Sequence, residues 1–113
     1  MRGGSVVIYG DGTQSRDYVF IDDVVDALVE ASRARDVDRL TMNIGWGLGT
    51  TVNELIRTVE RATGRRAHVL HNLQESGGVS RLCADITLAR EHLGYRPMVE
   101  LEEGLGLTSV YYQ

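Results

Sequence analysis

Two apolar stretches joined by a glycine turn constrain the fold of this sequence more than any other feature. Residues 5–9, SVVIY, and residues 17–21, DYVFI, are rich in the β-branched and aromatic side chains that are typical of strands. Gly10-Asp11-Gly12 lies between them, and glycine tolerates the positive φ angles of a tight turn. The pattern therefore predicts a β-hairpin at the start of a domain that combines strands with helices.

Two longer helices are predicted from their starting residues and from the spacing of their apolar side chains. Asp22 is expected to cap a helix that fades in the polar run 32–39 and carries on one face Val24, Ala27, Leu28 and Ala31. Thr51-Val-Asn-Glu54 has the Ser/Thr-x-x-Glu pattern of a capping box. The helix behind this box is expected to stop at Gly64, since glycine commonly ends helices.

The rest of the chain predicts shorter elements. Residues 40–44, LTMNI, and residues 67–71, AHVLH, are expected to be strands. Asp85 is expected to cap a third, short helix that ends at Gly94, and a fourth, weaker helix is expected from Glu100. No internal repeat or linker interrupts the 113 residues. We therefore expect one mixed α/β (α+β) domain over residues 1–113, with short strands and three to four helices.

Composition excludes several classes of function. The net charge of −4 argues against a nucleic-acid partner, which would normally need a basic face. No apolar run approaches the roughly 20 residues of a membrane span. Cys83 is the one cysteine and lies in an apolar patch, so a disulfide scaffold is excluded and a buried thiol in a reducing, cytoplasmic setting is expected. The chain has no lysine, which removes Schiff-base chemistry and lysine-containing phosphate loops.

The loop GWGLGT, residues 45–50, is the first candidate for a ligand site. It leads from a predicted strand to a helix N-terminus, where a phosphate could bind. The dinucleotide fingerprint needs a third glycine where Thr50 stands, and no acidic residue follows the next predicted strand. A structural turn is therefore the favoured interpretation over a nucleotide loop. His68 and His71 point to opposite faces of a strand, so no metal site is expected.

Two arginines are the remaining candidates for binding an anion. Arg16 enters the second predicted strand, and Arg81 follows the glycine-containing loop 75–80. A guanidinium presents a planar fork of donors that fits phosphate oxygens. From local chemistry alone, each could equally be a solvated surface arginine.

At this point the sequence resembles a known family. The stretch YGDGTQSRDYVFIDDVVDAL is similar to the segment that opens the C-terminal part of the extended short-chain dehydrogenase/reductases, namely the NAD-dependent nucleotide-sugar epimerases and dehydratases. MNIGWGLGTTVNELI, ADITLAREHLGYRP and LEEGLGLT resemble later stretches of the same part, in the same order. The resemblance covers the chain from about Val6 to Thr108.

The resemblance implies that this chain is the substrate-binding C-terminal portion of such an enzyme, either as a truncated form or as a gene product without its front half. In the family this portion lies over a Rossmann half, which carries NAD, a glycine-rich loop and a Tyr-x-x-x-Lys couple. This sequence contains none of these motifs. We therefore expect no cofactor and no catalytic residue in this chain, and a chain that is catalytically incomplete alone, although NAD serves the parent enzyme.

Carrying the family's phosphate contacts over gives an uneven result. Arg16 falls on the arginine that in relatives contacts the nucleotide phosphates. The second phosphate arginine falls on Glu75, while the glycine of its loop is kept as Gly77 and the acid becomes Gly78. The resemblance makes Arg81 the candidate to replace the lost arginine. The expected substrate-binding residues are therefore Arg16, Arg81 and Gly77, with a sugar nucleotide as the ligand of the parent enzyme.

Two other functions remain open. The chain could be a stand-alone module that binds an anion or nucleotide through Arg16 and Arg81, or an interaction domain that serves association only. The missing Rossmann half would leave apolar surface uncovered, so self-association is expected, most simply as a symmetric dimer.

Overall fold

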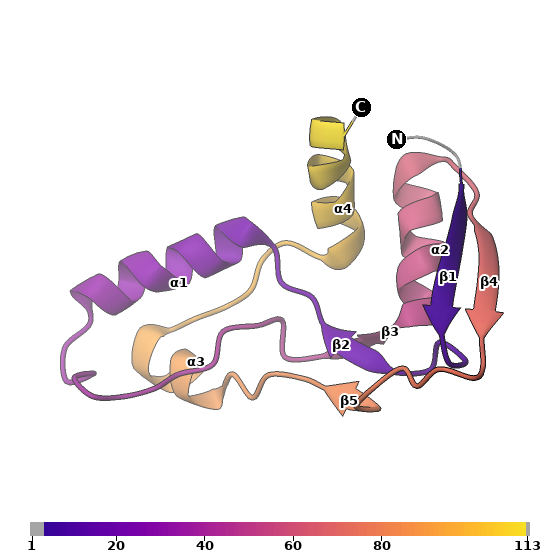
Figure 1. Ribbon diagram of the computed structural model, residues 1–113. Coiled ribbons are helices and arrows are strands. Elements are labelled where there is room, and N and C mark those ends of the chain that lie inside the picture. Colours follow the sequence, from indigo (N-terminus) through magenta and orange to yellow (C-terminus); the bar gives the residue numbers. More distant parts are fainter. Residues whose placement is uncertain (1–3, 113) are drawn as a thin grey trace.

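The computed structural model describes residues 4–112 as a mixed α/β structure with four α-helices and short strands (Figure 1). This confirms the predicted fold class. The elements in chain order are β1 (Ser5–Tyr9), β2 (Ser15–Asp17), α1 (Ile21–Arg33), β3 (Gly49–Thr51), α2 (Val52–Thr63), β4 (His68–Asn72), β5 (Arg81–Leu82), α3 (Thr87–Leu93), α4 (Leu101–Ser109) and a final 3₁₀ turn, η1 (Val110–Tyr112).

The strands form two small sheets, and the predicted hairpin is wrong. β1 pairs in parallel with β4, with Ser5 opposite His68, while β2 lies between β3 and β5. β2 runs antiparallel to β3 and parallel to β5, and it covers residues 15–17 instead of 17–21. Parallel strands need long crossover connections, so the partners of β1 and β2 come from distant segments that a local turn cannot reveal.

Residues 40–44 do not form the expected strand. No hydrogen bond joins residues 41–44 to any described residue, although their exposure alternates as in a strand. Met42 and Ile44 pack against the core, and Thr41 and Asn43 point outward. The segment has the alternating exposure of a strand, but no neighbouring strand pairs with it. The local sequence carries no information about such a partner, so the strand prediction failed here.

The second helix follows its local signals closely. In the capping box, the backbone N–H of Glu54 donates to Thr51 Oγ1 over 3.1 Å, and the N–H of Thr51 donates to Glu54 Oε2 over 2.9 Å. The helix ends at Gly64, which has a φ of 69°. β4 also lies within a residue of its predicted position.

The other helices depart from prediction mainly at their N-termini. The cap position of α1 is Phe20, which makes no side-chain cap, so the expected capping role of Asp22 is wrong. α3 starts at Thr87, whose backbone N–H and hydroxyl both donate to the carboxylate of Asp85. It ends at Gly94 as predicted, and α4 begins directly after Glu100.

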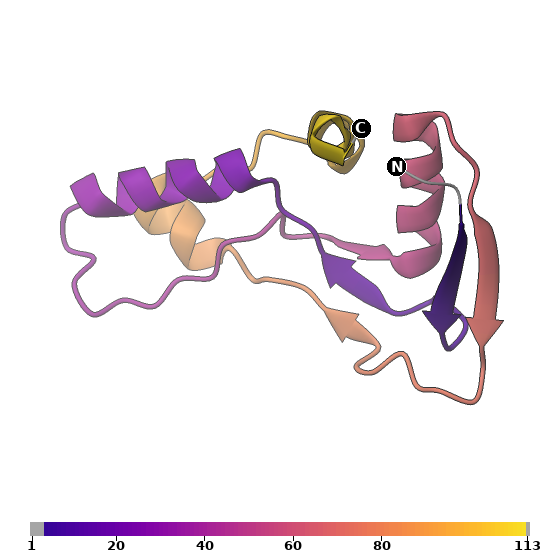
Figure 2. The ribbon, with the colours of Figure 1, turned by 45° about the horizontal axis from the view of Figure 1, so that its top comes forward.

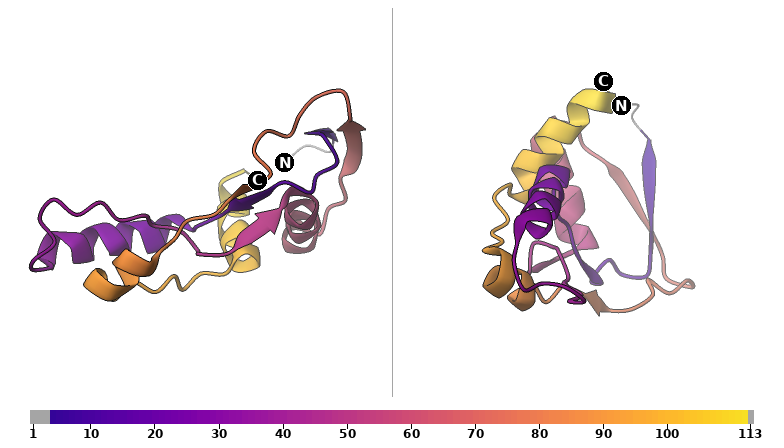
Figure 3. Two further views of the ribbon diagram at one scale, coloured as in Figure 1. Left: turned by 90° about the horizontal axis from the view of Figure 1, so that it is seen from below. Right: turned by 90° about the vertical axis from the view of Figure 1, so that its left-hand side faces the viewer.

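The molecule is flat and has a small core. Its extents are 49 × 32 × 15 Å, and its radius of gyration is 16.6 Å, whereas a compact chain of this length would have about 13 Å. α1 and α3 lie at one end, β1, β4 and α2 at the other, and α4 packs on α2 (Figures 1, 2 and 3). The core cluster consists of Ala27, Ile86, Ala89 and Tyr95. None of the helices in the described residues is long and apolar enough to cross a membrane.

Candidate functional site

Arg16 on β2 is the best-anchored of the predicted site residues. Its guanidinium donates to the carbonyl oxygens of Ser15 over 2.8 Å, Val79 over 2.7 Å and Gly77 over 3.3 Å. These bonds use three of the five N–H groups of a guanidinium. The other two have no partner in the part of the chain that the structure describes. Arg16 is therefore held in place with donors to spare.

Asp17, the next residue, is the acceptor for three backbone amides. Its carboxylate accepts hydrogen bonds from the N–H groups of Trp46 over 2.7 Å, Gly47 over 2.9 Å and Ala84 over 3.2 Å. The amides of the GWGLGT loop are thus turned toward a side chain of the protein itself. This geometry supports the interpretation of the loop as a structural turn, because its donors are not available to a phosphate.

Gly45 and Tyr95 complete this junction. A side chain on Gly45 would place its Cβ 2.7 Å from Asp17 Oδ2 and from the Cβ of Ala84, so only glycine fits. The phenol of Tyr95 donates to the carbonyl oxygen of Gly45 over 2.6 Å. Burial, together with the charges of Asp23 and Asp17, raises the pKa of the Tyr95 phenol. The turn after residues 40–44 is therefore fixed from both sides.

The side chain of Arg16 lines a surface hollow, which we call the Arg16 hollow. It has a volume of about 370 Å³ and is lined by Arg16, Asp17, Asn43, Ile44, Leu82, Cys83 and Ala84. Arg16 and Leu82 are register partners in the parallel pair of β2 and β5. Register partners lie on the same face of a sheet, so Leu82 forms a wall next to the guanidinium.

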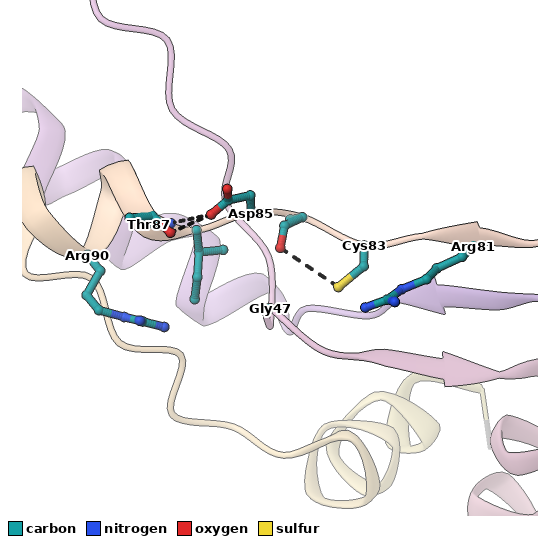
Figure 4. Close-up of a pocket in the computed structure, with 8 residues that line it drawn as sticks. Gly47, Arg81, Cys83, Asp85, Thr87 and Arg90 are labelled. Carbon is teal, nitrogen blue, oxygen red and sulfur yellow. Dashed lines mark hydrogen bonds between the residues drawn. The ribbon is translucent and has the colours of Figure 1, made fainter.

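Arg81 lies elsewhere. Because side chains alternate along a strand, Arg81 points to the opposite face of β5 from Leu82. It lines a second hollow of about 490 Å³, together with Gly47, Cys83, Ala84, Asp85, Ile86, Thr87 and Arg90 (Figure 4). We call this the Arg81 hollow. Figure 4 shows Arg81 and Arg90 approaching it from its two ends. The structure thus does not bring Arg16 and Arg81 into one hollow.

The Arg81 hollow is not purely cationic. Hydrogen bonds from the hydroxyl and backbone N–H of Thr87 lower the pKa of the Asp85 carboxyl, so this carboxylate is ionised at neutral pH. Cys83 lines both hollows and its thiol is half-buried, which corrects the expectation of a buried thiol. Its Sγ lies 3.9 Å from Asp17 Oδ2.

Gly77 supports Arg16 from behind. Its carbonyl oxygen accepts the bond from Arg16, and a Cβ at this position would lie 2.6 Å from Nε2 of Gln14. A larger residue would therefore require the flexible end of the Gln14 side chain to move, and the observed contact of Gly77 with the site is through the backbone. Glu75 makes no ion pair with any described residue.

The sequence interpretation missed the role of Asp17 and the walls formed by Asn43 and Leu82. Asp17 directly follows Arg16 in the stretch YGDGTQSRDYVFIDDVVDAL, so its place in that stretch was the available signal. No sequence signal indicated that Asn43 and Leu82 form these walls, because the walls depend on the pairing of β2 with β5. Within residues 4–112, no group of three or more His, Cys, Asp or Glu side chains could hold a metal ion.

Comparisons with known proteins agree with the motifs. Residues 1–45 match the NAD dependent epimerase/dehydratase family. The chain is 36% identical to UDP-glucose 4-epimerase from Mycolicibacterium smegmatis over 113 residues, which is 100% of this chain and 36% of the relative. It is 35% identical to a putative UDP-glucose 4-epimerase from Methanocaldococcus jannaschii, over 93% of this chain and 33% of the relative.

Solved structures show the same likeness. UDP-glucose 4-epimerase from Thermotoga maritima, solved with UDP-glucose, has a TM-score of 0.87 and 43% identity over 97% of this chain and 35% of that one. A UDP-glucuronic acid 4-epimerase mutant from Bacillus cereus, solved with UDP-4-deoxy-4-fluoro-glucuronic acid and NAD, has a TM-score of 0.85 and 30% identity, over 95% of this chain and 34% of that one.

These findings confirm the resemblance to the NAD-dependent epimerase/dehydratase family. The chain spans about a third of the length of the relatives that it matches. It is thus related over nearly its whole length to one part of these epimerases.

Proposed function

We propose that residues 1–113 form the substrate-binding C-terminal portion of a nucleotide-sugar epimerase or dehydratase, and that this portion is catalytically incomplete alone. The observation that carries the proposal is the anchored guanidinium of Arg16 in the wall of the Arg16 hollow. A side chain already fixed by three hydrogen bonds loses little conformational freedom when it binds a ligand. Its two remaining N–H groups suit the oxygens of a diphosphate.

The surroundings of Arg16 fit an anionic ligand better than the charge of the chain suggests. Asp17, the acidic residue that lines the Arg16 hollow, accepts hydrogen bonds from three backbone amides. Leu82 and Ile44 add apolar wall beside the guanidinium. The hollow is open, and we propose that a Rossmann portion outside this chain would close it over the sugar nucleotide.

The described residues do not fit NAD. The glycine-rich loop before α2 turns the amides of Trp46 and Gly47 toward Asp17, so these donors cannot cradle a pyrophosphate. In our proposal, NAD and the groups that move protons belong to the other portion. The contribution of this chain is to bind and orient the substrate, since the reacting groups must be held together for hydride and proton transfer.

Titrations of the chain with UDP and with NAD test this proposal. We expect weak UDP binding that Arg16→Ala abolishes and Arg16→Lys only partly restores, because lysine lacks the planar fork. Arg96→Ala is a matched control, since Arg96 lines neither hollow. Micromolar NAD binding, or epimerase turnover by the chain alone, would contradict the proposal.

A second candidate function rests on the Arg81 hollow. Arg81 and Arg90 face one space, and the guanidinium of neither donates a hydrogen bond to a described residue. This arrangement suits a stand-alone module that binds a small anion, although the ionised Asp85 weakens it. Phosphate binding that is lost in Arg81→Ala and kept in Arg16→Ala would favour this function over the first.

A further inference from the structure

The short strand β5 is held at both ends by two neighbouring residues of β2. β5 has only two residues, so its backbone pairing with β2 supplies few hydrogen bonds. Before β5, the guanidinium of Arg16 donates to the carbonyl oxygens of Gly77 and Val79. After β5, the backbone N–H of Ala84 donates to Asp17 Oδ2 over 3.2 Å. The wall that β5 and the residues after it give to the Arg16 hollow is therefore fixed by side chains as well as by strand pairing.

The carboxylate of Asp17 also holds a second wall of the same hollow. This wall contains Asn43 and Ile44, whose backbone groups form no hydrogen bond with residues 4–112. Shortly after it, the backbone N–H groups of Trp46 and Gly47 donate to Oδ1 over 2.7 Å and to Oδ2 over 2.9 Å. Asp17 therefore connects both walls to the strand that carries Arg16.

The packing around Asp17 leaves its carboxylate little room to move. A Cβ on Gly45 would lie 2.7 Å from Asp17 Oδ2 and 2.7 Å from the Cβ of Ala84, so the two walls meet at the carboxylate. The carbonyl oxygen of Gly45 accepts a hydrogen bond of 2.6 Å from the phenol of Tyr95, whose side chain is buried in the core. A short link between fixed supports sets the spacing of the walls.

The negative charge of Asp17 by itself opposes the binding of an anion in this hollow. Asp17 and Arg16 both line the hollow, and a carboxylate repels phosphate oxygens. On charge alone, the hollow would hold a diphosphate more tightly without Asp17. The three backbone amides give the carboxylate a different use, because they attach both walls to β2.

We propose that Asp17 is a positioning residue for the ligand that Arg16 binds. Its carboxylate fixes residues 45–47 and the segment after β5 around the guanidinium of Arg16, and so sets the width of the Arg16 hollow. It acts on the ligand through these walls. The proposal rests on the proposed function for the ligand, whereas the position of the walls is a property of this chain that is measured without a ligand.

Titration of the chain with UDP tests the proposal through the sign of one effect. In Asp17→Asn, an NH₂ group replaces one carboxylate oxygen and faces at least one backbone N–H donor, so at least one of the three bonds is lost. Removal of the charge alone would tighten UDP binding. Loss of the wall positions should instead weaken it, by about tenfold for a site that becomes about 1 Å too loose. Tighter or unchanged binding in the folded variant would overturn the proposal.

Two further variants separate position from charge. Asp22→Asn removes the same charge from an exposed carboxylate that lines neither hollow, so UDP binding should stay at the wild-type level. Asp17→Glu keeps the charge but moves the oxygens outward by one methylene, where the close approach of Gly45 and Ala84 leaves no space. It should bind UDP as weakly as Asp17→Asn. Wild-type affinity in Asp17→Glu would show that charge alone matters and would contradict the proposal.

A variant that leaves Asp17 unchanged covers the case in which the Asp17 variants do not fold. Ala84→Pro removes one of the three N–H donors while the carboxylate and its charge remain. It should weaken UDP binding severalfold, with a wild-type circular dichroism spectrum. Wild-type affinity in folded Ala84→Pro would count against the positioning role.

Amide hydrogen exchange of the ligand-free chain distinguishes positioning from a general loss of stability. In Asp17→Asn, the N–H groups of Gly47 and Ala84 should exchange about tenfold faster or more, while Ala27, buried within α1, should keep its wild-type rate. Equal acceleration at all three amides would mean that Asp17 only stabilises the fold, and would overturn the proposal. A wild-type chain that binds no UDP would refute the proposed function, and the exchange rates would still decide whether Asp17 holds the walls.

Discussion

Helices α1 and α2 are alike in length and amphipathic character, but they differ in what covers them. Leu55, Ile56 and Val59 of α2 are half-buried, and α4 packs on this helix. On α1, the matching apolar side chains face outward, and Leu28 is 66% exposed. The comparison teaches that an amphipathic pattern predicts a helix but does not say whether the same chain will bury its apolar face.

The two helices are also held by different kinds of contact. α2 begins with a capping box and ends at a glycine, so its limits are set by neighbouring residues. α1 has no side-chain cap, and polar contacts from Asp23 to the α3–α4 connection fix its position. The stability of α1 should therefore depend more on one buried carboxylate, and the stability of α2 should depend more on packing.

The largest effect is expected for Asp23→Ala on the inner face of α1. The change removes two charge-assisted hydrogen bonds and leaves two backbone N–H groups without acceptors, so the free energy of unfolding should fall by about 3 kcal/mol. Urea denaturation followed by circular dichroism measures it. Asp22→Ala on the exposed side of the first turn is the control, and equal losses for both variants would refute the role of Asp23.

A pair of truncations compares the two apolar faces. Ile56→Ala on α2 should lower the free energy of unfolding by about 1–2 kcal/mol, since a half-buried side chain loses part of the usual core penalty. Leu28→Ala on α1 should cost less than about 0.5 kcal/mol in the monomer. The fluorescence of the single Trp46 allows both to be measured at submicromolar concentration, where association is weak. A larger cost for Leu28→Ala would mean that the outward apolar face of α1 is buried within one chain.

A smaller effect is expected at the start of α2. Thr51→Ala removes the acceptor of the capping box and should cost about 1 kcal/mol. Thr51→Ser keeps the hydroxyl and should come close to wild type. Denaturant midpoints of the three proteins provide the measurement. α1 has no side-chain cap, so a substitution of Phe20, its N-cap residue, would remove no capping hydrogen bond.

The smallest expected effect is a pH dependence of the stability that Glu54 contributes to α2. Hydrogen bonds from the N–H and hydroxyl of Thr51 lower the pKa of the Glu54 carboxyl below 4.5. A carboxyl with a lowered pKa stabilises the fold above the unfolded pKa, and this stability is lost as the pH falls through the folded pKa. Between pH 7 and about pH 5, this contribution should therefore be constant, and it should decline below about pH 4. Glu54→Gln should flatten that decline, and an unchanged acid profile would contradict the assignment.

Much of the local structure could be predicted from particular residues. The capping box at Thr51, the glycine stops at Gly64 and Gly94, and the strand-like composition of residues 5–9 all act within a few positions of the chain. Such signals depend on φ angles and neighbouring hydrogen bonds, so they survive without knowledge of the fold. The motifs around Arg16 likewise identified the family relationship, which the comparisons confirm.

The sequence by itself thus determined where α2 and β4 lie and which family the chain resembles, while the tertiary structure decided every pairing. The hairpin did not form because β1 found its partner in β4, and residues 40–44 remained without a strand partner. Arg16 and Arg81 fell on opposite faces of one sheet because the register aligns Arg16 with Leu82. Such outcomes depend on contacts between residues far apart in the chain, and a shift of register by one residue would have reversed which side chain shares the hollow.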